Sequence, residues 1–355
     1  MAISGLRLNL PLFKFSVGRL GASQRTWPEL ASETTVLEPG GERIFPPAIF
    51  LPGDLEKIRG YSPWRKQKTE LELINGGKRE VTPSVVHRLK DASIVGPTVY
   101  KGASRYAVGY EQQDSWLLDS ESAADRRESV NLVTSWSGSR WFGCLLLDDY
   151  AREIMPADPE NNLGMRSKDY IHDAQYRDVL GLGELPIARN VRARNLNVFF
   201  CTSTYKAEQY RQLRERLQPV LEDGRSANPV FIGRGTDGER REVGNASELE
   251  VKLREWGFDI LSPSELTVDE IVRRTAGSRL VMGVEGSHLS HAVFTMAEGG
   301  TMVTLQPPSR IAMPYKEFTD VMDMRYALLI GDESGEDMFT VDLDALERLL
   351  GLCRF

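Results

Sequence analysis

Residues 280–294, LVMGVEGSHLSHAVF, combine an apolar run, a Gly-Ser pair and a segment with helical periodicity. The run LVMGV predicts a buried strand, and Gly286 with Ser287 marks the turn that opens a helix. The apolar residues beyond the turn recur at the spacing of one buried helix face: Leu289, Ala292, Val293 and Met296. His288 and His291 fall on another face, so we expect them to point away from the core. The stretch predicts one strand–turn–helix unit of an α/β fold.

Similar apolar runs alternate with helical segments through the second half of the chain. The predicted strands are LNVFFCT (196–202), PVFIG (229–233), FDIL (258–261), RLVMGV (279–284), TMVTLQ (301–306) and ALLIG (327–331). The predicted helices include KAEQYRQLRERLQPVLE, ASELEVKLREWG and TVDEIVRRTAGS. Such alternation is typical of βαβ units and of a parallel, doubly wound sheet. In these folds, ligands bind beyond the carboxyl ends of the strands.

The first half of the chain has a weaker pattern. Residues 20–80 are rich in Pro, Gly and charge, which predicts loops with short strands. Residues 81–112 alternate β-branched residues with turns and predict a small strand-rich arm. RWFGCLLLDDYAREI, residues 140–154, has the spacing of a helix start. The chain closes with DLDALERLLGL, which predicts an amphipathic helix with an Asp cap.

The composition is that of a soluble globular protein large enough for two domains. Of 355 residues, 41% are hydrophobic and 27% are charged. The net charge of −7 argues against non-specific binding to nucleic acid or anionic membranes, although it leaves room for a local basic pocket. Three widely spaced cysteines, Cys144, Cys201 and Cys353, fit a reducing compartment without a disulfide framework.

The apolar stretches of the sequence bear on where the protein is located. The apolar stretches at the N-terminus are interrupted by Arg7, Lys14 and Arg19, and they are too short for a secretory signal. No later run approaches the length of a membrane span. We therefore expect a cytoplasmic protein. Peripheral association with the inner face of a membrane and the oligomeric state stay open at this point.

The Gly286-Ser287 turn favours an anion. A strand, a Gly-Ser turn and a helix N-terminus present free backbone N–H groups and the positive end of the helix dipole, which suits a phosphate. An ordinary turn of an α/β protein is the alternative. A metal site would use Glu285, His288 and His291, but Glu285 precedes the helix and no Cys or acidic cluster completes a ligand set. We therefore predict no metal.

A second motif is the loop FIGRGTDGERREVGN, residues 231–245. Gly233, Gly235 and Gly238 satisfy the dinucleotide pattern G-x-G-x-x-G. Charged residues 239–242 follow, where a dinucleotide-binding helix buries small and apolar residues. The loop bears three arginines whose guanidinium groups suit a pyrophosphate: Arg234, Arg240 and Arg241. A solvated surface loop is the alternative, and Asn245 with Glu248 predicts a capping box.

These motifs occur in the order found in a known family. The Arg-bearing loop, Asn and a helix, WGFDILSPSELTVDEI and a strand ending in Gly-x-x-Gly-Ser-x-Leu together resemble the family 61 glycosyltransferases. This family includes capsular polysaccharide enzymes and xylosyl- and N-acetylglucosaminyl-transferases. The resemblance runs from about Val81 to Val341. It implies a GT-B fold, with two Rossmann-like domains facing a cleft, and inverting transfer without an obligatory metal or other cofactor.

The resemblance implies that Arg234 contacts the donor diphosphate with help from Arg240 or Arg241, and that Gly286 and Ser287 lie at the donor phosphates. From its position beside these residues, we also expect His288 at the phosphates. The residues expected at the sugar or nucleotide are Asn245, His291, Trp141 and Cys144. The chain departs from the family pattern twice: Glu285-Gly286-Ser287 replaces His-Gly-Ser, and Phe142-Gly143-Cys144 replaces Phe-Gly-His. His288 and His291 stand near the first departure and could take over the contacts of the customary histidine.

An inverting transferase needs a base for the acceptor hydroxyl and positive charge for the departing diphosphate. Asp148 and Asp149 are the base candidates, with Glu285 as the alternative. Because surface carboxylates are common, a solvated helix face is the competing interpretation for Asp148 and Asp149. Without a metal, the positive charge must come from arginines and a helix N-terminus.

The expected organisation follows. Residues 1–205 form an acceptor-side domain that includes the arm at 81–112, residues 206–340 form the nucleotide-sugar-binding Rossmann-like domain, and residues 341–355 form a helix that packs back on the first domain. The expected partners are a nucleotide-sugar donor and a saccharide or glycoconjugate acceptor in surface polysaccharide synthesis, with no nucleic acid. A non-catalytic nucleotide-sugar-binding scaffold is the second hypothesis. A nicotinamide-dependent oxidoreductase, suggested only by the glycine pattern, is the third.

Overall fold

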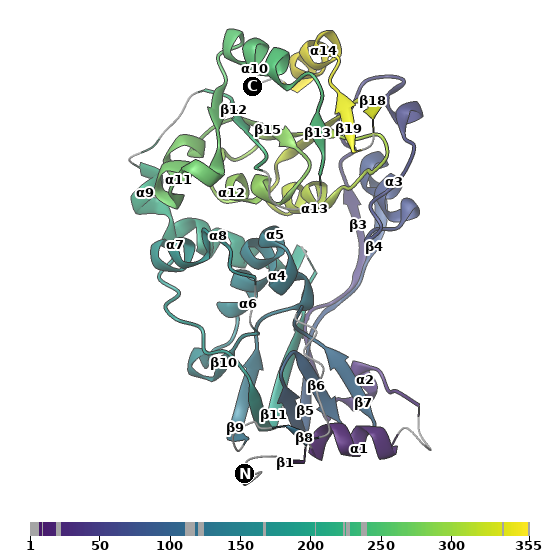
Figure 1. The fold of residues 1–355 in the computed structure, drawn as a ribbon, viewed down its shortest axis with the longest axis vertical. Coiled ribbons are helices and arrows are strands. Elements are labelled where there is room, and N and C mark those ends of the chain that lie inside the picture. The colour runs from purple at the N-terminus through teal and green to yellow at the C-terminus, as the bar shows by residue number, and fades with distance from the viewer. Residues whose placement is uncertain are drawn as a thin grey trace, which may run out of the picture. The chain divides into compact units, whose positions relative to one another are not determined.

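The chain folds into two compact units of mixed α/β structure (Figure 1). The computed structural model describes residues 7–8, 10–18, 23–110, 118–119, 124–165, 168–202, 204–222, 224, 228–235, 240–335 and 337–353. Unit 1 comprises Met1–Gly40, Thr82–Tyr170 and Leu182–Tyr205. Unit 2 comprises Gly41–Val81, Ile171–Gly181 and Lys206–Phe355. Two segments that precede residue 206 therefore belong with the C-terminal part of the chain.

Unit 2 is built on a five-stranded parallel sheet with the order β14-β12-β15-β16-β17. Its strands are β12 (Val230–Ile232), β14 (Asp259–Leu261), β15 (Leu280–Val284), β16 (Thr301–Gln306) and β17 (Arg325–Ile330). Every residue of β12, β15 and β16 is buried. Such continuous burial is expected where helices cover both faces of a parallel sheet. These five strands confirm five of the six strands predicted in the second half.

The sixth predicted strand, LNVFFCT, has a different place. It forms the end of β11 (Asn190–Phe200), which belongs to the sheet of unit 1. There β11 pairs antiparallel with β5 (Ser84–Val95) and parallel with β9 (Asp125–Leu132). An apolar run predicts that a strand is buried, and strands of both sheets are buried. The run does not indicate which strands lie next to it, so it cannot predict which sheet it joins.

The helices of unit 2 follow the predicted alternation. They are α3 (Gln67–Asn75), α7 (Asp173–Val179), α8 (Ala207–Arg216), α9 (Gln218–Glu222), α10 (Ala246–Glu255), α11 (Val268–Thr275), α12 (Ser290–Val293), α13 (Pro314–Val321) and α14 (Leu343–Cys353). α10 and α14 lie side by side and share one core with alternate residues of β15, namely Leu280, Met282 and Val284. A small sheet, β13 (Glu242–Val243), β19 (Met338–Thr340) and β18 (Asp332–Gly335), completes this side.

The C-terminal helix packs within unit 2, rather than on the N-terminal domain as the sequence analysis expected. Leu346 and Leu349 of α14 are fully buried in the core of the parallel sheet. The Arg325 guanidinium at the start of β17 donates hydrogen bonds to the carbonyl oxygens of Leu352 and Cys353. The predicted Asp cap is present, because Asp342 accepts a hydrogen bond from the Ala345 N–H at 3.0 Å.

The segment 41–81 is more regular than predicted. It contains α3 and a two-stranded antiparallel sheet of β3 (Gly41–Phe45) and β4 (Gly77–Val81). Between them, Ile49 exchanges backbone hydrogen bonds of 2.9 Å with Tyr326 and Leu328, so it continues the parallel sheet beside β17. These pairings are long-range, and the Pro- and Gly-rich local sequence does not reveal them.

Unit 1 contains a seven-stranded mixed sheet. Its order is β10-β9-β11-β5-β6-β7, with β2 (Glu33–Glu38) also paired to β5. β10 spans Asn162–Leu163, β6 Thr98–Lys101 and β7 Ser104–Ala107. Unit 1 also contains β1 (Arg7–Leu8), β8 (Leu118–Asp119), α1 (Leu10–Gly18), α2 (Trp27–Leu30), the helical run Trp136–Glu153 and a 3₁₀ helix, Pro159–Asn161. This mixed sheet differs from the Rossmann-like domain that the resemblance implies for the first half.

The helical run of unit 1 contains an irregular turn. α4 (Trp136–Arg140) and α5 (Phe142–Cys144) lead into a π-helical turn, Leu145–Asp149, before α6 (Tyr150–Glu153). The helix predicted over 140–154 is therefore present but widened at its centre. None of the described helices has the length and apolar character needed to cross a bilayer.

The core of unit 2 yields a stability prediction. We expect Leu346→Ala to lower the free energy of unfolding by about 2–5 kcal/mol, because it deletes a fully buried side chain and leaves a cavity. Leu352→Ala on the same helix is the matched control, since Leu352 is 48% exposed, and its effect should stay within about 0.5 kcal/mol. Urea unfolding measures both, and equal effects would contradict the packing described for α14.

Candidate functional site

The strand order of unit 2 identifies the edge where a ligand site is expected. If the five strands are numbered by their order in the chain, their order across the sheet is 2-1-3-4-5. The chain therefore moves from β12 toward one edge of the sheet and from β15 toward the other edge. Ligands of doubly wound sheets bind beyond the carboxyl ends of the strands at such a switch point. Arg234 follows β12, and Glu285, Gly286 and Ser287 follow β15. The structure therefore brings the two predicted phosphate motifs to the same edge.

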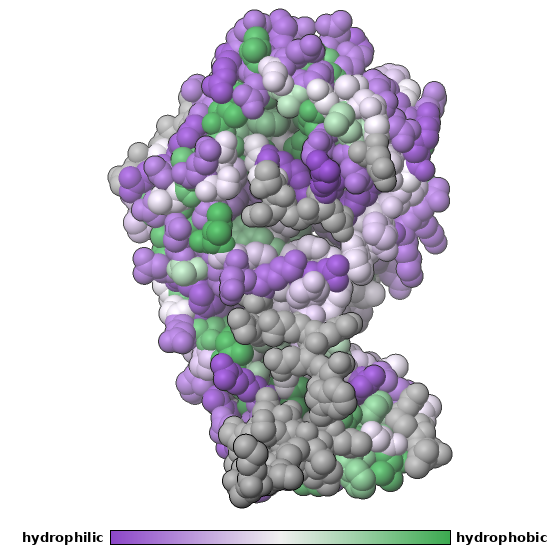
Figure 2. Space-filling view, viewed as in Figure 1, coloured by the Kyte–Doolittle hydropathy of each residue, from purple (hydrophilic) through white to green (hydrophobic). Residues whose placement is uncertain are grey.

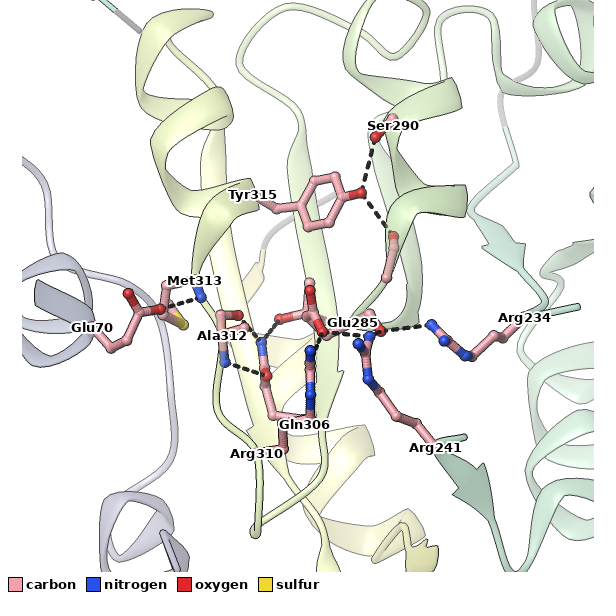
Figure 3. Close-up of polar contacts among 12 residues, drawn as sticks. Glu70, Arg234, Arg241, Glu285, Ser290, Gln306, Arg310, Ala312, Met313 and Tyr315 are labelled. Atoms are coloured by element: carbon pink, nitrogen blue, oxygen red, sulfur yellow. Dashed lines mark hydrogen bonds and ion pairs between the residues drawn. The ribbon is translucent and has the colours of Figure 1, made fainter. Parts of the chain in front are cut away.

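The contact between these motifs depends on Gly286. Arg234 Nη1 donates a hydrogen bond to the Glu285 backbone oxygen at 3.2 Å (Figure 3). A Cβ atom built on Gly286 would overlap this Nη1 atom. The backbone of Gly286 is extended, so the requirement for glycine comes from the close approach of the guanidinium group and not from backbone strain.

Glu285 organises two further arginines. Its buried carboxylate lies 2.6 Å from Arg241 Nη1 and 3.3 Å from Arg310 Nη1. Arg241 also donates to the Glu285 backbone oxygen, the same atom that Arg234 contacts. We call Arg234, Arg241 and Arg310 the arginine cluster. Two of these guanidinium groups pair with the Glu285 carboxylate, and the third contacts the Glu285 backbone. The three positive charges and one negative charge leave a net positive charge at the carboxyl ends of β12, β15 and β16.

The positive charge is partly desolvated. Burial lowers the pKa of Arg234 to about 10, and repulsion from Arg241 and Arg310 adds to the effect, while Glu285 opposes it. Arg234 is still protonated at neutral pH. Because buried charges interact through a lower effective dielectric, an anion placed here would be held more strongly than on the open surface.

The turn after β15 is shorter than the predicted helix start. Ser287–Leu289 form a 3₁₀ turn, and α12 adds only Ser290–Val293. A helix this short sums few peptide dipoles. Its macrodipole therefore adds less positive charge at the turn than the sequence pattern predicts. The guanidinium groups are the main source of positive charge at this site. Ser287 is half-buried at the turn, directly after Gly286.

α13 fixes the turn after β15 through hydrogen bonds of Tyr315. The Tyr315 hydroxyl donates to the Gly286 backbone oxygen at 2.7 Å and lies 2.9 Å from Ser290 Oγ. Just before α13, the Met313 N–H donates to the fully buried carboxylate of Glu70 at 2.6 Å (Figure 3). Arg65 pairs with the other oxygen of Glu70 at 2.6 Å. The arginine cluster therefore rests on a turn that is fixed by buried hydrogen bonds.

His288 lies within this site as a neutral imidazole. Burial lowers its pKa to about 3, and the charges of Arg234 and Arg241 contribute. Its Nε2 atom is buried and makes no hydrogen bond within the described part of the chain. This atom faces Gly283, where a Cβ atom would lie 3.3 Å away. The prediction that His288 points away from the core is therefore wrong.

His291 is also buried, again in contrast to the prediction. Its Nδ1 lies 2.7 Å from the Tyr176 hydroxyl, the two rings stack, and the His172 ring meets it edge-on at 5.0 Å. Burial lowers the pKa of His291 well below its usual value, with charge repulsion from His172 and His288 as smaller causes. The partners come from residues 171–181, which helical periodicity around His291 cannot reveal.

The remaining motif residues of unit 2 lie outside the arginine cluster. Arg240 is 74% exposed and pairs with Glu242 at 2.7 Å. Asn245 does not form the predicted capping box, since its side chain makes two hydrogen bonds of 2.9 Å with the backbone of Val341. Gly238 and Glu239 lie outside the described residues. The next described helix, α10, begins at Ala246, too far from Gly233 for a dinucleotide fingerprint.

The alternative metal ligands have separate roles. Glu285 pairs with arginines, and His291 bonds to Tyr176. Over the described ranges, no group of three or more His, Cys, Asp or Glu side chains is arranged to hold a metal ion.

The base candidates of the first half lie in unit 1. Asp149 is buried and accepts hydrogen bonds from the Ser135 N–H at 3.1 Å, the Ser135 hydroxyl at 2.8 Å and Arg152 at 2.7 Å. Burial raises the pKa of Asp149 to about 7, although Arg152 and Ser135 oppose this. A Cβ atom on Gly138 would overlap the Asp149 carboxylate. Asp148 is half-buried on the same π-helical turn.

The aromatic and thiol candidates are close to this turn in the sequence. Trp141 meets Trp136 edge-on at 5.4 Å, and the Arg140 guanidinium lies 5.2 Å from both ring centroids. Cys144 is a half-buried free thiol. The cation among these rings is a feature that the sequence analysis did not predict.

Three residues of the site were missed from the sequence: Arg310, Tyr315 and Glu70. Arg310 had a usable signal, because it follows β16 at the carboxyl edge of the sheet, where Arg234 and Ser287 also lie. Tyr315 and Glu70 had none. Their roles depend on contacts between segments far apart in the chain.

Two histidines of unit 2, the half-buried His288 and the buried His291, make this unit sensitive to acid. Their pKa values are lowered in the folded protein, so below about pH 6.5 the unfolded chain binds protons that the folded chain does not, and stability falls by about 1.4 kcal/mol per histidine per pH unit. We expect His291→Gln to reduce the slope of unfolding free energy against pH by the contribution of one histidine, about 1.4 kcal/mol per pH unit. Tyr176→Phe keeps a buried His291 and should keep the slope. Equal slopes in wild type and His291→Gln would refute this.

The sequence itself was compared with known proteins. It matches the family described as Glycosyltransferase 61 over residues 43–303, well over half of the chain. No curated protein matches the sequence. The matched range includes Arg234, Glu285, Gly286 and Ser287, whereas Arg310 and α13 follow it. The match confirms the resemblance deduced from the order of motifs, and this chain belongs to glycosyltransferase family 61.

Proposed function

We propose that this glycosyltransferase moves a sugar from a nucleotide-sugar donor to a saccharide or glycoconjugate acceptor in surface polysaccharide synthesis, with inversion and without an obligatory metal. Family membership supports glycosyl transfer in general. The observation that supports the donor site is the arginine cluster at the carboxyl ends of β12, β15 and β16. The GT-B arrangement implied by the resemblance is part of this proposal.

The electrostatic argument concerns the leaving group. When the bond between the sugar and the nucleotide breaks, negative charge grows on the departing diphosphate. Arg234, Arg241 and Arg310 offer fixed N–H donors and a net positive charge, since Glu285 neutralises only one of them. A pre-organised guanidinium site can stabilise this charge as a metal ion would. The absence of a side chain at Gly286 lets the Arg234 guanidinium lie against the backbone of the turn that carries Ser287.

The base assignment follows from the surroundings of each carboxylate. The oxygens of Asp149 are engaged by Ser135 and Arg152 in a buried environment, and Glu285 is engaged by two arginines. We assign the acceptor-activating base to Asp148 because it is half-buried on the π-helical turn, whereas Asp149 and Glu285 are buried and less accessible to an acceptor. Arg152 interacts electrostatically with both Asp148 and Asp149. π-Helical turns are frequent at functional sites because they displace side chains from the regular helical spacing. Asp149 acts as the buried anchor of this turn.

The donor site makes a direct prediction for nucleotide binding. We expect Arg234→Ala and Arg241→Ala to weaken binding of nucleoside diphosphates by about tenfold to a hundredfold, the value of one or two charge-assisted hydrogen bonds. Calorimetric titration with a panel of nucleoside diphosphates measures this. Arg240→Ala is the matched control on the same loop, because Arg240 is exposed and paired with Glu242, and it should change affinity less than about twofold. If wild type binds no member of the panel, the donor-site assignment fails.

The base assignment predicts a different kinetic signature. Asp148→Asn should lower kcat by about a hundredfold or more while nucleotide affinity stays unchanged, because a general base acts in the chemical step. A transfer assay with a panel of nucleotide sugars and saccharide acceptors measures this effect. Full activity in Asp148→Asn would assign the base elsewhere.

A non-catalytic nucleotide-sugar-binding protein is the second candidate. It is favoured by Glu285 and Cys144, which replace two histidines that many relatives have. This candidate requires nucleotide binding by wild type without turnover, so a single glycosidic product that wild type forms eliminates it.

A further inference from the structure

We propose that the outer face of α1 in unit 1 docks on a lipid bilayer that contains anionic headgroups. The surface consists of Leu10, Phe13, Lys14 and Val17. The three apolar side chains are 54%, 45% and 51% exposed, and no residue of α1 is buried. Figure 2 shows apolar surface on the part of unit 1 where α1 lies.

The helical spacing places these four residues on one face. Positions separated by three, four and seven residues lie above one another on a helix, so Leu10, Phe13, Lys14 and Val17 form one stripe. The opposite face is fastened to unit 1: the Phe15 ring meets the Tyr100 ring edge-on at 6.2 Å. The helix is therefore attached to the protein while its other apolar stripe is open to solvent.

The charge pattern around α1 differs from that of the whole protein. The chain has a net charge of −7, yet its first 28 residues contain four basic residues and no Asp or Glu: Arg7, Lys14, Arg19 and Arg25. Strands β6 and β7 of unit 1 add Lys101 and Arg105. The Arg105 guanidinium lies 4.9 Å from the centroid of the Phe15 ring of α1. Apolar side chains flanked by cations match the interface of a bilayer with anionic headgroups.

The size of the surface argues against a second copy of the chain as the occupant. A stable protein interface buries roughly 800 Å² on each partner and involves about 20–30 residues. Three apolar side chains on a nine-residue helix are far fewer. They are enough for reversible insertion into the headgroup region, where each buried side chain adds to electrostatic attraction.

The inference goes beyond sugar transfer, because it assigns a surface rather than a substrate. It gives physical content to the peripheral association that the sequence left open. The overall negative charge would oppose non-specific adsorption, so contact with the bilayer is restricted to the end of unit 1 that bears α1.

Co-sedimentation of the full-length protein with vesicles tests the proposal. We expect binding to vesicles of phosphatidylcholine with roughly one third phosphatidylglycerol, weaker binding to pure phosphatidylcholine, and a several-fold loss between about 0.1 M and 0.5 M salt. The triple variant Leu10→Ser, Phe13→Ser, Val17→Ser should bind at least about tenfold more weakly. Lys14→Glu should lower binding only to the anionic vesicles.

A matched control removes exposed apolar side chains elsewhere in unit 1. Val36 is 58% and Ile187 46% exposed, so Val36→Ser with Ile187→Ser should leave vesicle binding unchanged. Thermal unfolding verifies that each variant is folded, and hydrogen exchange of the wild type should show new protection of α1 when vesicles are added. Equal vesicle binding by wild type and the folded triple variant overturns the proposal. So does a wild-type dimer that dissociates in the triple variant and ignores vesicles.

Discussion

The contact between the Arg234 guanidinium and the backbone at Glu285 and Gly286 is the constraint on which the candidate site depends. It exists only because Gly286 has no side chain, and it joins the loop after β12 to the turn after β15. The sheet order places these two strands side by side at the switch point. A larger residue at Gly286 would force apart the two motifs that the proposed donor site requires.

Glu285 determines the charge of this site as well as its geometry. A buried carboxylate is costly unless it is paired, and Arg241 and Arg310 provide that pairing. In return, the carboxylate holds two guanidinium groups close to a third at a position where repulsion alone would separate them. Glu285 is thus an anion that organises cations, and His288 stays neutral among them.

The supporting contacts come from distant parts of the sequence. Glu70 fixes the backbone before α13, and Tyr315 of α13 fixes the Gly286 backbone, so a segment near residue 70 supports the turn after β15. In unit 1, Asp149 has a similar function for the π-helical turn that presents Asp148. Both oxygens of each buried carboxylate, Glu70 and Asp149, accept hydrogen bonds, so these carboxylates anchor local structure.

The strands of the parallel sheet, the Gly286-Ser287 turn, the arginine-bearing loop and the family can be predicted from the sequence, because burial periodicity and turn chemistry are local properties of the chain. Four features follow from long-range packing instead: β11 joins the sheet of unit 1, α14 packs within unit 2, His291 is buried beside Tyr176, and the Asn245 side chain bonds to Val341 instead of capping a helix. The tertiary structure also decided which arginines meet: Arg241 and Arg310 reach Glu285, whereas Arg240 pairs with Glu242 on the surface. Each of these outcomes depends on a partner far away along the chain, and local spacing contains no information about such partners.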